Sequence, residues 1–136
     1  RVKIFSTVKE MPKLLNLIIL TLYCGFIFWL SSQPNIPMPM LFLHQDKIHH
    51  MGAYFIMGIL TWRLFNDYLN KAIYTLITSL LFCSLYGLSD EWHQSYVPGR
   101  DADILDWLAD TIGALLALTY IQITRNKFSV AKVQKF

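Results

Sequence analysis

Four long apolar segments dominate the sequence, each long enough to cross the hydrocarbon core of a bilayer as a helix. They run from about residue 14 to 30, 48 to 64, 72 to 89 and 104 to 124. A membrane-spanning helix needs roughly 17–25 mostly apolar residues, whereas the strands of a membrane barrel alternate apolar and polar residues. The chain is also 54% hydrophobic and only 15% charged. These features predict an all-α fold, a four-helix transmembrane bundle formed by residues 1–136 as a single domain.

The charged residues divide unevenly between the two sides of such a bundle. With four spans, both termini and the middle loop share one side, and the opposite side holds only Lys47 and Arg100 as basic residues. Because Lys and Arg concentrate in cytoplasmic segments, we expect both termini in the cytoplasm of a multi-pass protein of the cell membrane. The terminal side carries ten of the twelve basic residues: Arg1, Lys3, Lys9, Lys13, Arg63, Lys71, Arg125, Lys127, Lys132 and Lys135.

The first apolar run lacks the small-residue exit of a cleaved signal peptide, and three more runs follow it. We therefore expect it to be a retained span. The formal net charge of +3 is small and dispersed along the chain, so we expect membrane lipids rather than nucleic acid as partners.

The side opposite the termini is acidic, and much of its charge lies in the stretch "LSDEWHQSYVPGRDADILDWLAD" (88–110). Within it, Pro98-Gly99 marks a turn. All four histidines are on this side, and so are seven of the nine acids: Asp46, Asp90, Glu91, Asp101, Asp103, Asp106 and Asp110.

Helical spacing gathers these polar residues into three stripes. Residues three or four apart share a helix face, and ionisable residues at this depth are costly unless they face the bundle interior and find partners. The stripes therefore predict a shared polar pocket at the extracytoplasmic end, although a purely structural polar cluster is the alternative. The stripes are Asp46, His50 and Tyr54; Tyr86, Asp90 and Gln94, with His93 nearby; and Asp103, Asp106 and Asp110.

The third stripe continues with Gly113 and Ala117. Ala109, Gly113 and Ala117 also form a series of small residues that allows another helix to approach closely. The excess of acid leaves three kinds of compensation open: raised carboxyl pKa values, charged histidines, or a bound cation. Asp, Glu and His can ligate a divalent metal, but the sequence has no HExxH or CxxC motif. Arg100 either pairs with Asp90, Glu91 or Asp103, or holds a phosphate or carboxylate through two parallel hydrogen bonds.

Four motifs resemble those of the VanZ-like family of small multi-pass membrane proteins. They are "SSQP" (31–34), "DKIHHMGAY" (46–54), "DEWHQSYVPGR" (90–100) and "ADTIGA" (109–114), and the resemblance extends from about residue 14 to 120. The sequence departs from the family pattern at His49, where such proteins often carry an apolar residue, and at Asp110, where they often carry Asn. The family is named for a protein associated with teicoplanin resistance, so the resemblance implies a link to glycopeptide or lipoglycopeptide resistance.

Two functions fit these observations. In the first, the pocket binds a lipid headgroup, a cell-envelope precursor or an amphiphilic antibiotic. In the second, the protein is a membrane enzyme that acts on a lipid-linked or cell-envelope substrate, with His50 or the Asp90/Glu91 pair as acid or base; no G-x-S-x-G motif supports it. The candidate site comprises Asp46, Lys47, His50, Tyr54, Asp90, Glu91, His93, Gln94, Arg100, Asp103, Asp106 and Asp110.

Overall fold

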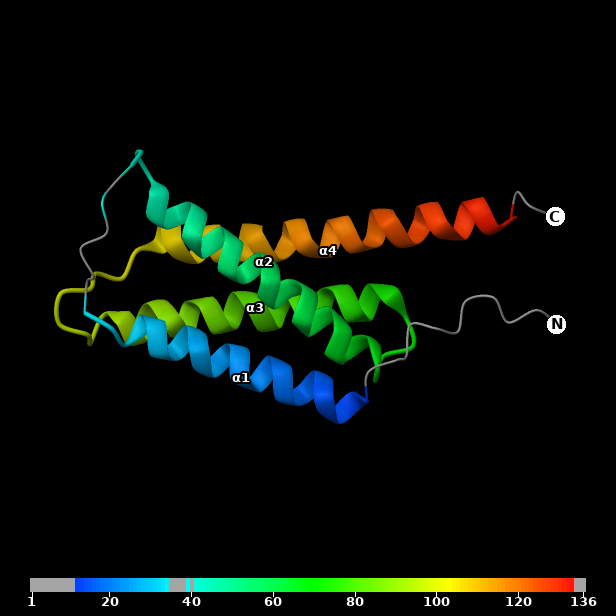
Figure 1. Ribbon diagram of the computed structural model, residues 1–136, viewed down its shortest axis with the longest axis horizontal. Helices are drawn as coiled ribbons and strands as arrows, with labels where there is room; N and C mark the ends of the chain where they lie inside the picture. Colours follow the sequence, from blue (N-terminus) through cyan, green and yellow to red (C-terminus); the bar gives the residue numbers. More distant parts are fainter. Residues whose placement is uncertain (1–11, 35–38, 40, 134–136) are drawn as a thin grey trace.

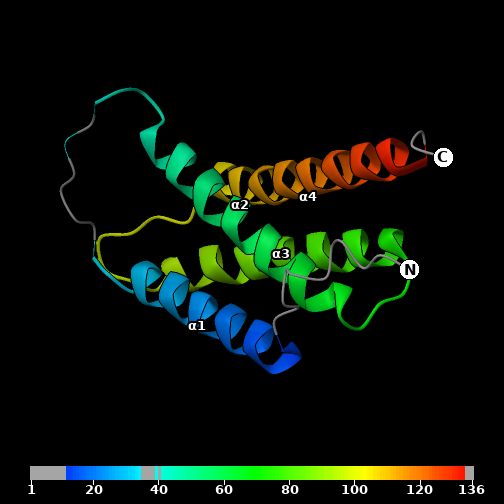
Figure 2. The same cartoon turned by 45° about the vertical axis from the view of Figure 1, so that its right-hand side comes forward.

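The protein forms a bundle of four helices, shown in Figures 1 and 2. This computed structural model describes residues 12–34, 39 and 41–133. The helices are α1 (Lys13–Ser31), α2 (Gln45–Asn66), α3 (Ala72–Gln94) and α4 (Ile104–Val133), and the described residues form no strand. The predicted all-α four-helix bundle is therefore confirmed. The polar sequence "DEWHQ" continues α3 five residues beyond the predicted end at Ser89.

Three of the four helices are long and apolar enough to cross a membrane: α1, α3 and the Ile104–Asn126 part of α4. Large apolar side chains such as Leu22, Leu85 and Ile123 are at least half exposed on them, as lipid-facing residues are. The second predicted span, α2, has the length but a more polar composition, since it includes Asp46, Lys47, two histidines and Arg63. It packs against all three other helices, so protein rather than lipid covers much of its surface.

The packing of α2 on α4 depends on small residues of α4. A Cβ atom at Gly113 would overlap the backbone carbonyl of Met51 in α2, so only glycine permits this approach. Ala114 and Ala117 beside it have no exposed surface. The small-residue series of the fourth span therefore does what its spacing predicts and brings two helix backbones together.

α1 ends and α2 begins at one end of the bundle, where α3 also ends and α4 begins (Figure 1). The helix α1 ends at Ser31, just before Pro34. Gly99 adopts a φ of 81°, a left-handed conformation that glycine tolerates without strain. The turn predicted at Pro98-Gly99 is thus confirmed.

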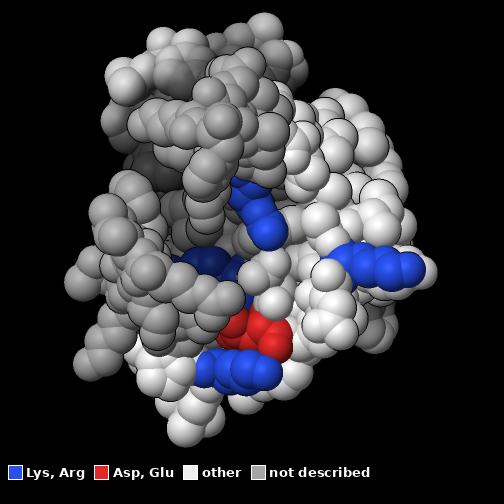
Figure 3. Space-filling model, turned by 90° about the vertical axis from the view of Figure 1, so that its right-hand side faces the viewer, with Lys and Arg blue, Asp and Glu red and all other residues white. Residues whose placement is uncertain are grey.

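The other end, where α1 begins and α4 ends, is basic. Figure 3 looks onto this end and shows Lys and Arg side chains around a small acidic area. Lys13, Arg63, Lys71 and Arg125 lie at or near helix ends there. These basic residues therefore gather at the end where α1 begins and α4 ends, as the sequence predicts. The cytoplasmic location of this end stays a prediction.

Candidate functional site

A cavity of about 890 Å³ lies at the end of the bundle opposite the basic one. Ile27, Leu30 and Ala53 give it an apolar wall, while the rest of its lining is largely polar. Residues from all four helices and from the loop before α4 contribute to it. Nine of the twelve candidate residues line this cavity: Asp46, Lys47, His50, Tyr54, Asp90, Gln94, Arg100, Asp103 and Asp106.

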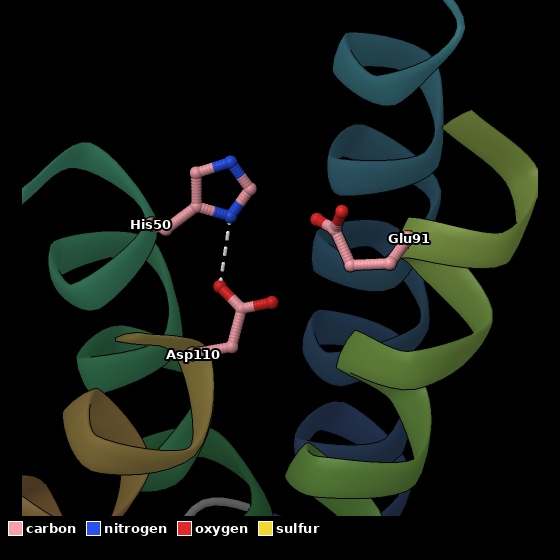
Figure 4. A group of neighbouring side chains, drawn as sticks. All are labelled: His50, Glu91 and Asp110. Atoms are coloured by element: carbon pink, nitrogen blue, oxygen red, sulfur yellow. Dashed lines mark hydrogen bonds and ion pairs between the residues drawn. The ribbon is translucent and has the colours of Figure 1, made fainter. Parts of the chain in front are cut away.

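His50 and two acids form the innermost part of the polar cluster. His50 Nδ1 lies 2.9 Å from Oδ1 of Asp110, and His50 Nε2 lies 3.9 Å from Oδ2 of Asp106. Glu91 extends from α3 toward His50 and Asp110 (Figure 4). Each of these three residues offers one possible ligand atom, and the three atoms lie within 4.8 Å of one another. The structure thus brings together polar residues of α2, α3 and α4, including every member of the three stripes except Tyr86, which lines a second cavity.

Asp110 is fully buried, with no exposed surface. Its carboxylate fits against α3 because residue 87 is a glycine: a Cβ atom there would lie 2.9 Å from Asp110 Oδ2. The carboxylate therefore occupies space that a side chain on α3 would otherwise take. Its placement beside His50 depends on Gly87 in α3 as well as on α4 itself.

Lys47 links three carboxylates around the mouth of the cavity. Its Nζ lies 2.9 Å from Asp46, 2.5 Å from Asp103 and 2.7 Å from Asp106. The hydrogen bond from Lys47 holds the pKa of Asp103, in the loop before α4, below its ordinary value. The backbone N–H of Asp103 also donates to Glu91 Oε2 at 2.8 Å. These contacts fix the loop across the acidic cluster and neutralise part of its charge.

Arg100 forms no ion pair with any carboxylate of the described residues. Its Nε and Nη2 donate to Gln94 Oε1 at 3.2 and 2.8 Å, and Gln94 in turn donates to Asp90 at 3.3 Å. The expectation that Arg100 pairs with Asp90, Glu91 or Asp103 is therefore wrong, because Gln94 lies between the guanidinium and the acid. The guanidinium lines the cavity with donors to spare.

Five buried polar atoms at or near the cavity lack a hydrogen-bond partner among the described residues: Ser31 Oγ, the Tyr54 hydroxyl, Glu91 Oε1, Asp106 Oδ1 and Asp110 Oδ2. Asp106 Oδ1 still has an ion-pair contact with Lys47, and each of the five residues is at most 7% exposed. Buried polar atoms without a partner are uncommon, because each forfeits the hydrogen bonds it made with water. They mark where a ligand would find unsatisfied groups.

His93 is the candidate residue that lies apart from this cluster. Its ring stacks on Phe28 with centroids 4.5 Å apart, and its Nε2 lies 3.0 Å from the Ser32 hydroxyl. It lines a second cavity of about 420 Å³ on α1 and α3. Asp90 lines both cavities, whereas His93 lines only this second one.

The cavity also includes polar residues that the spacing argument does not assign to it: Ser31, Gln33, Gln45, His49 and Asp101. Ser31 and Gln33 belong to the "SSQP" sequence, which carries the family resemblance but no titratable group. The position of this sequence at the same end of the bundle could have indicated that it contributes to the cavity. His49 neighbours His50 yet is exposed.

Comparison with known proteins places these features in a family. A family model described as VanZ/LLP1 matches residues 3–125. An uncharacterized protein of Schizosaccharomyces pombe is 29% identical over 119 residues, which cover 87% of this chain and 65% of that protein. The chain thus spans about two thirds of its relative's length. No solved structure matches.

Proposed function

The chain belongs to the VanZ/LLP1 family, and we propose that it is a multi-pass protein of the cell membrane that binds the anionic headgroup of an amphiphile. The cavity at the acidic end of the bundle would be the binding site, open to the extracytoplasmic side. The protein's partners are then membrane lipids and one lipid-linked or otherwise amphiphilic ligand.

The observation that carries this proposal is the set of contacts that the Arg100 side chain makes. In a site so rich in acids, the guanidinium forms an ion pair with none of the described carboxylates and is held instead by the neutral Gln94. An arginine with free N–H donors is suited to bind a phosphate or a carboxylate through two parallel hydrogen bonds. Gln94 supports the side chain without using up its charge.

The apolar wall supports an amphiphile rather than a small soluble anion. Ile27 and Leu30 of α1 line the cavity together with the charged groups, so one ligand can contact both. An anionic phospholipid, a lipid-linked cell-envelope precursor and an amphiphilic antibiotic with a carboxylate all have this combination of groups. Binding of such an antibiotic at this site would link the protein to glycopeptide or lipoglycopeptide resistance.

The proposal can be tested by native mass spectrometry of the protein purified in detergent. The probes are phosphatidic acid, which carries a phosphate, oleic acid, which carries a carboxylate, a lipoglycopeptide, and oleylamine, which carries a cation. We expect the anionic probes to bind the wild type and Arg100→Lys to weaken them by about tenfold or more, because lysine cannot form two parallel hydrogen bonds. Arg125→Lys, at the opposite end of α4, is the matched control.

Equal loss of binding in the two lysine variants would contradict a specific role for Arg100. A preference of the wild type for oleylamine would contradict an anionic ligand altogether. Among the anionic probes, the tightest binder distinguishes a lipid phosphate from a carboxylate or an antibiotic.

A second candidate, a membrane enzyme, is favoured by the contact between His50 and Asp110. A buried carboxylate that contacts one nitrogen of an imidazole orients the ring as a general base or acid. Asp110 makes this contact with His50, and His50 lines the cavity. Arg100 would then hold the substrate's phosphate or carboxylate. Mass spectrometry of a bound lipid-linked substrate after incubation tests this: a product formed by the wild type and not by His50→Gln supports catalysis, and its absence from both contradicts it.

A further inference from the structure

His50, Glu91 and Asp110 come from three different helices and converge on one small volume (Figure 4). Each presents a ligand atom of the kind that divalent metals bind in proteins, one imidazole nitrogen and two carboxylate oxygens. All three atoms lie within 4.8 Å of one another. The arrangement is therefore more specific than a group of acids on one surface.

The distances suit coordination. Two ligand atoms at right angles around an ion, each about 2.1 Å from it, lie roughly 3.0 Å apart, and two atoms on opposite sides lie roughly 4.2 Å apart. His50 Nδ1 and Asp110 Oδ1 are 2.9 Å apart, which matches the first separation. The separations to the Glu91 oxygen are at most 4.8 Å, which is within about 0.6 Å of the second.

The buried oxygen atoms in this volume point to a missing partner. Glu91 is 5% exposed and Asp110 is fully buried, yet Glu91 Oε1 and Asp110 Oδ2 accept no hydrogen bond from the described residues. Figure 4 shows the Glu91 carboxylate directed toward His50 and Asp110. A cation between the three side chains would satisfy both oxygens at once.

The Lys and Arg residues that the structure describes do not serve this purpose. Lys47 contacts Asp46, Asp103 and Asp106, and no Lys or Arg of the described residues forms an ion pair with Glu91 or Asp110. His50 contacts Asp110 but forms no ion pair with Glu91, and a buried carboxylate without a counter-charge is costly. We propose that His50, Glu91 and Asp110 bind a divalent transition-metal ion at the inner end of the cavity.

The donor set narrows the choice of ion. Imidazole favours transition metals, whereas Mg²⁺ and Ca²⁺ prefer oxygen ligands alone. One nitrogen with two carboxylates fits Zn²⁺ or Mn²⁺, and the open cavity leaves positions for water or a ligand group. This inference goes beyond the proposed headgroup binding, because metal binding can be measured without any amphiphile.

The test uses the full chain purified in detergent, stripped with EDTA and dialysed. Zn²⁺, Mn²⁺ and Mg²⁺ are titrated separately, while bound metal is measured by mass spectrometry and the melting temperature is recorded. We expect one Zn²⁺ or Mn²⁺ per chain and a melting temperature that rises with its concentration, since a ligand of the folded state stabilises it. Mg²⁺ should produce a smaller shift.

Variants then locate the ion. Glu91→Gln and Asp110→Asn keep side-chain size and one oxygen ligand each, and we expect either to weaken metal binding by about tenfold or more. His50→Gln should do the same, while His44→Asn, which changes an exposed histidine outside the cavity, should bind metal as the wild type does.

Several results would overturn the proposal. One is a wild-type protein that binds less than about one tenth of an ion per chain and shows no shift with any of the three metals. Another is tight binding retained in Glu91→Gln and Asp110→Asn, and a third is equal loss in His44→Asn and His50→Gln. If His50→Gln fails to fold, the wild-type titration together with Glu91→Gln and Asp110→Asn decides whether the metal site exists.

Discussion

His50 Nδ1 lies 2.9 Å from Asp110 Oδ1 although 60 positions separate the two residues in the chain. The contact joins α2 to α4, and it lies beside the closest approach of these helices, where Gly113 meets the Met51 carbonyl. Met51 follows His50, and Gly113 lies three residues after Asp110. The geometry of the site therefore depends on the packing of small residues one turn away.

Gly113→Ala should accordingly destabilise the bundle. The added methyl group overlaps the backbone of α2, which cannot move aside as a flexible side chain would. Overpacking of this kind costs about 1–3 kcal/mol, and it should also separate His50 from Asp110. Thermal unfolding in detergent measures the first effect, and the metal titration measures the second.

Gly52→Ala is the control for this substitution. A Cβ atom at Gly52 meets nothing within 4 Å, and alanine favours a helix over glycine. This variant should be as stable as the wild type or slightly more so. Equal destabilisation of the two variants would show that the close contact at Gly113 is not the cause.

Lys47→Met should destabilise the protein by leaving Asp106 without its counter-charge. The side chains of Lys47 and Asp106 are only 18% and 10% exposed, so water replaces little of the lost interaction. Breaking a buried pair costs roughly 3 kcal/mol or more. Chemical denaturation measures the loss.

The second substitution Asp106→Asn should restore much of the stability lost in Lys47→Met, because it removes the charge that Lys47 balances. Asp106→Asn alone should leave a milder defect than Lys47→Met. Additive losses in the double variant would mean that the two side chains do not interact energetically.

Tyr54→Phe should leave stability unchanged or slightly improved, because the hydroxyl that it removes is buried without a partner among the described residues. If that hydroxyl serves the bound headgroup, the variant should bind phosphatidic acid more weakly. Tyr86→Phe is the control: its hydroxyl donates to the Cys24 carbonyl at 2.6 Å, so its loss should cost about 1 kcal/mol. Unchanged lipid binding in Tyr54→Phe would exclude that hydroxyl from the site.

Much of the bundle and of the cluster could be predicted from the sequence, because helical periodicity decides which residues share a face. Stripes on α2, α3 and α4 can meet for that reason, and in the structure His50 Nε2 lies 3.9 Å from Asp106 Oδ2. Helical periodicity does not determine how loops fold. The contacts of Lys47 with Asp103 and of Arg100 with Gln94 depend on the path of residues 95–103.

Mean hydropathy alone does not class α2 with the three helices that are apolar enough to cross a membrane. Its histidines, Asp46 and Arg63 lower its apolar character, but the helix packs against three others and needs less lipid-compatible surface. The position of His93 shows the limit of spacing within a helix. It follows Asp90 by three residues, yet it turns toward Phe28 and Ser32 rather than into the cavity.

The last prediction concerns orientation. The described basic residues at the end of α4 and the start of α1 favour a cytoplasmic location for that end. A cysteine introduced at Asn126 should therefore resist a membrane-impermeant maleimide in intact cells and react after permeabilisation. A cysteine at Tyr96, which is 72% exposed at the other end, should react in intact cells. The reverse pattern would place the cavity on the cytoplasmic side, and an extracytoplasmic ligand would then be ruled out while the metal site and its test would stand unchanged.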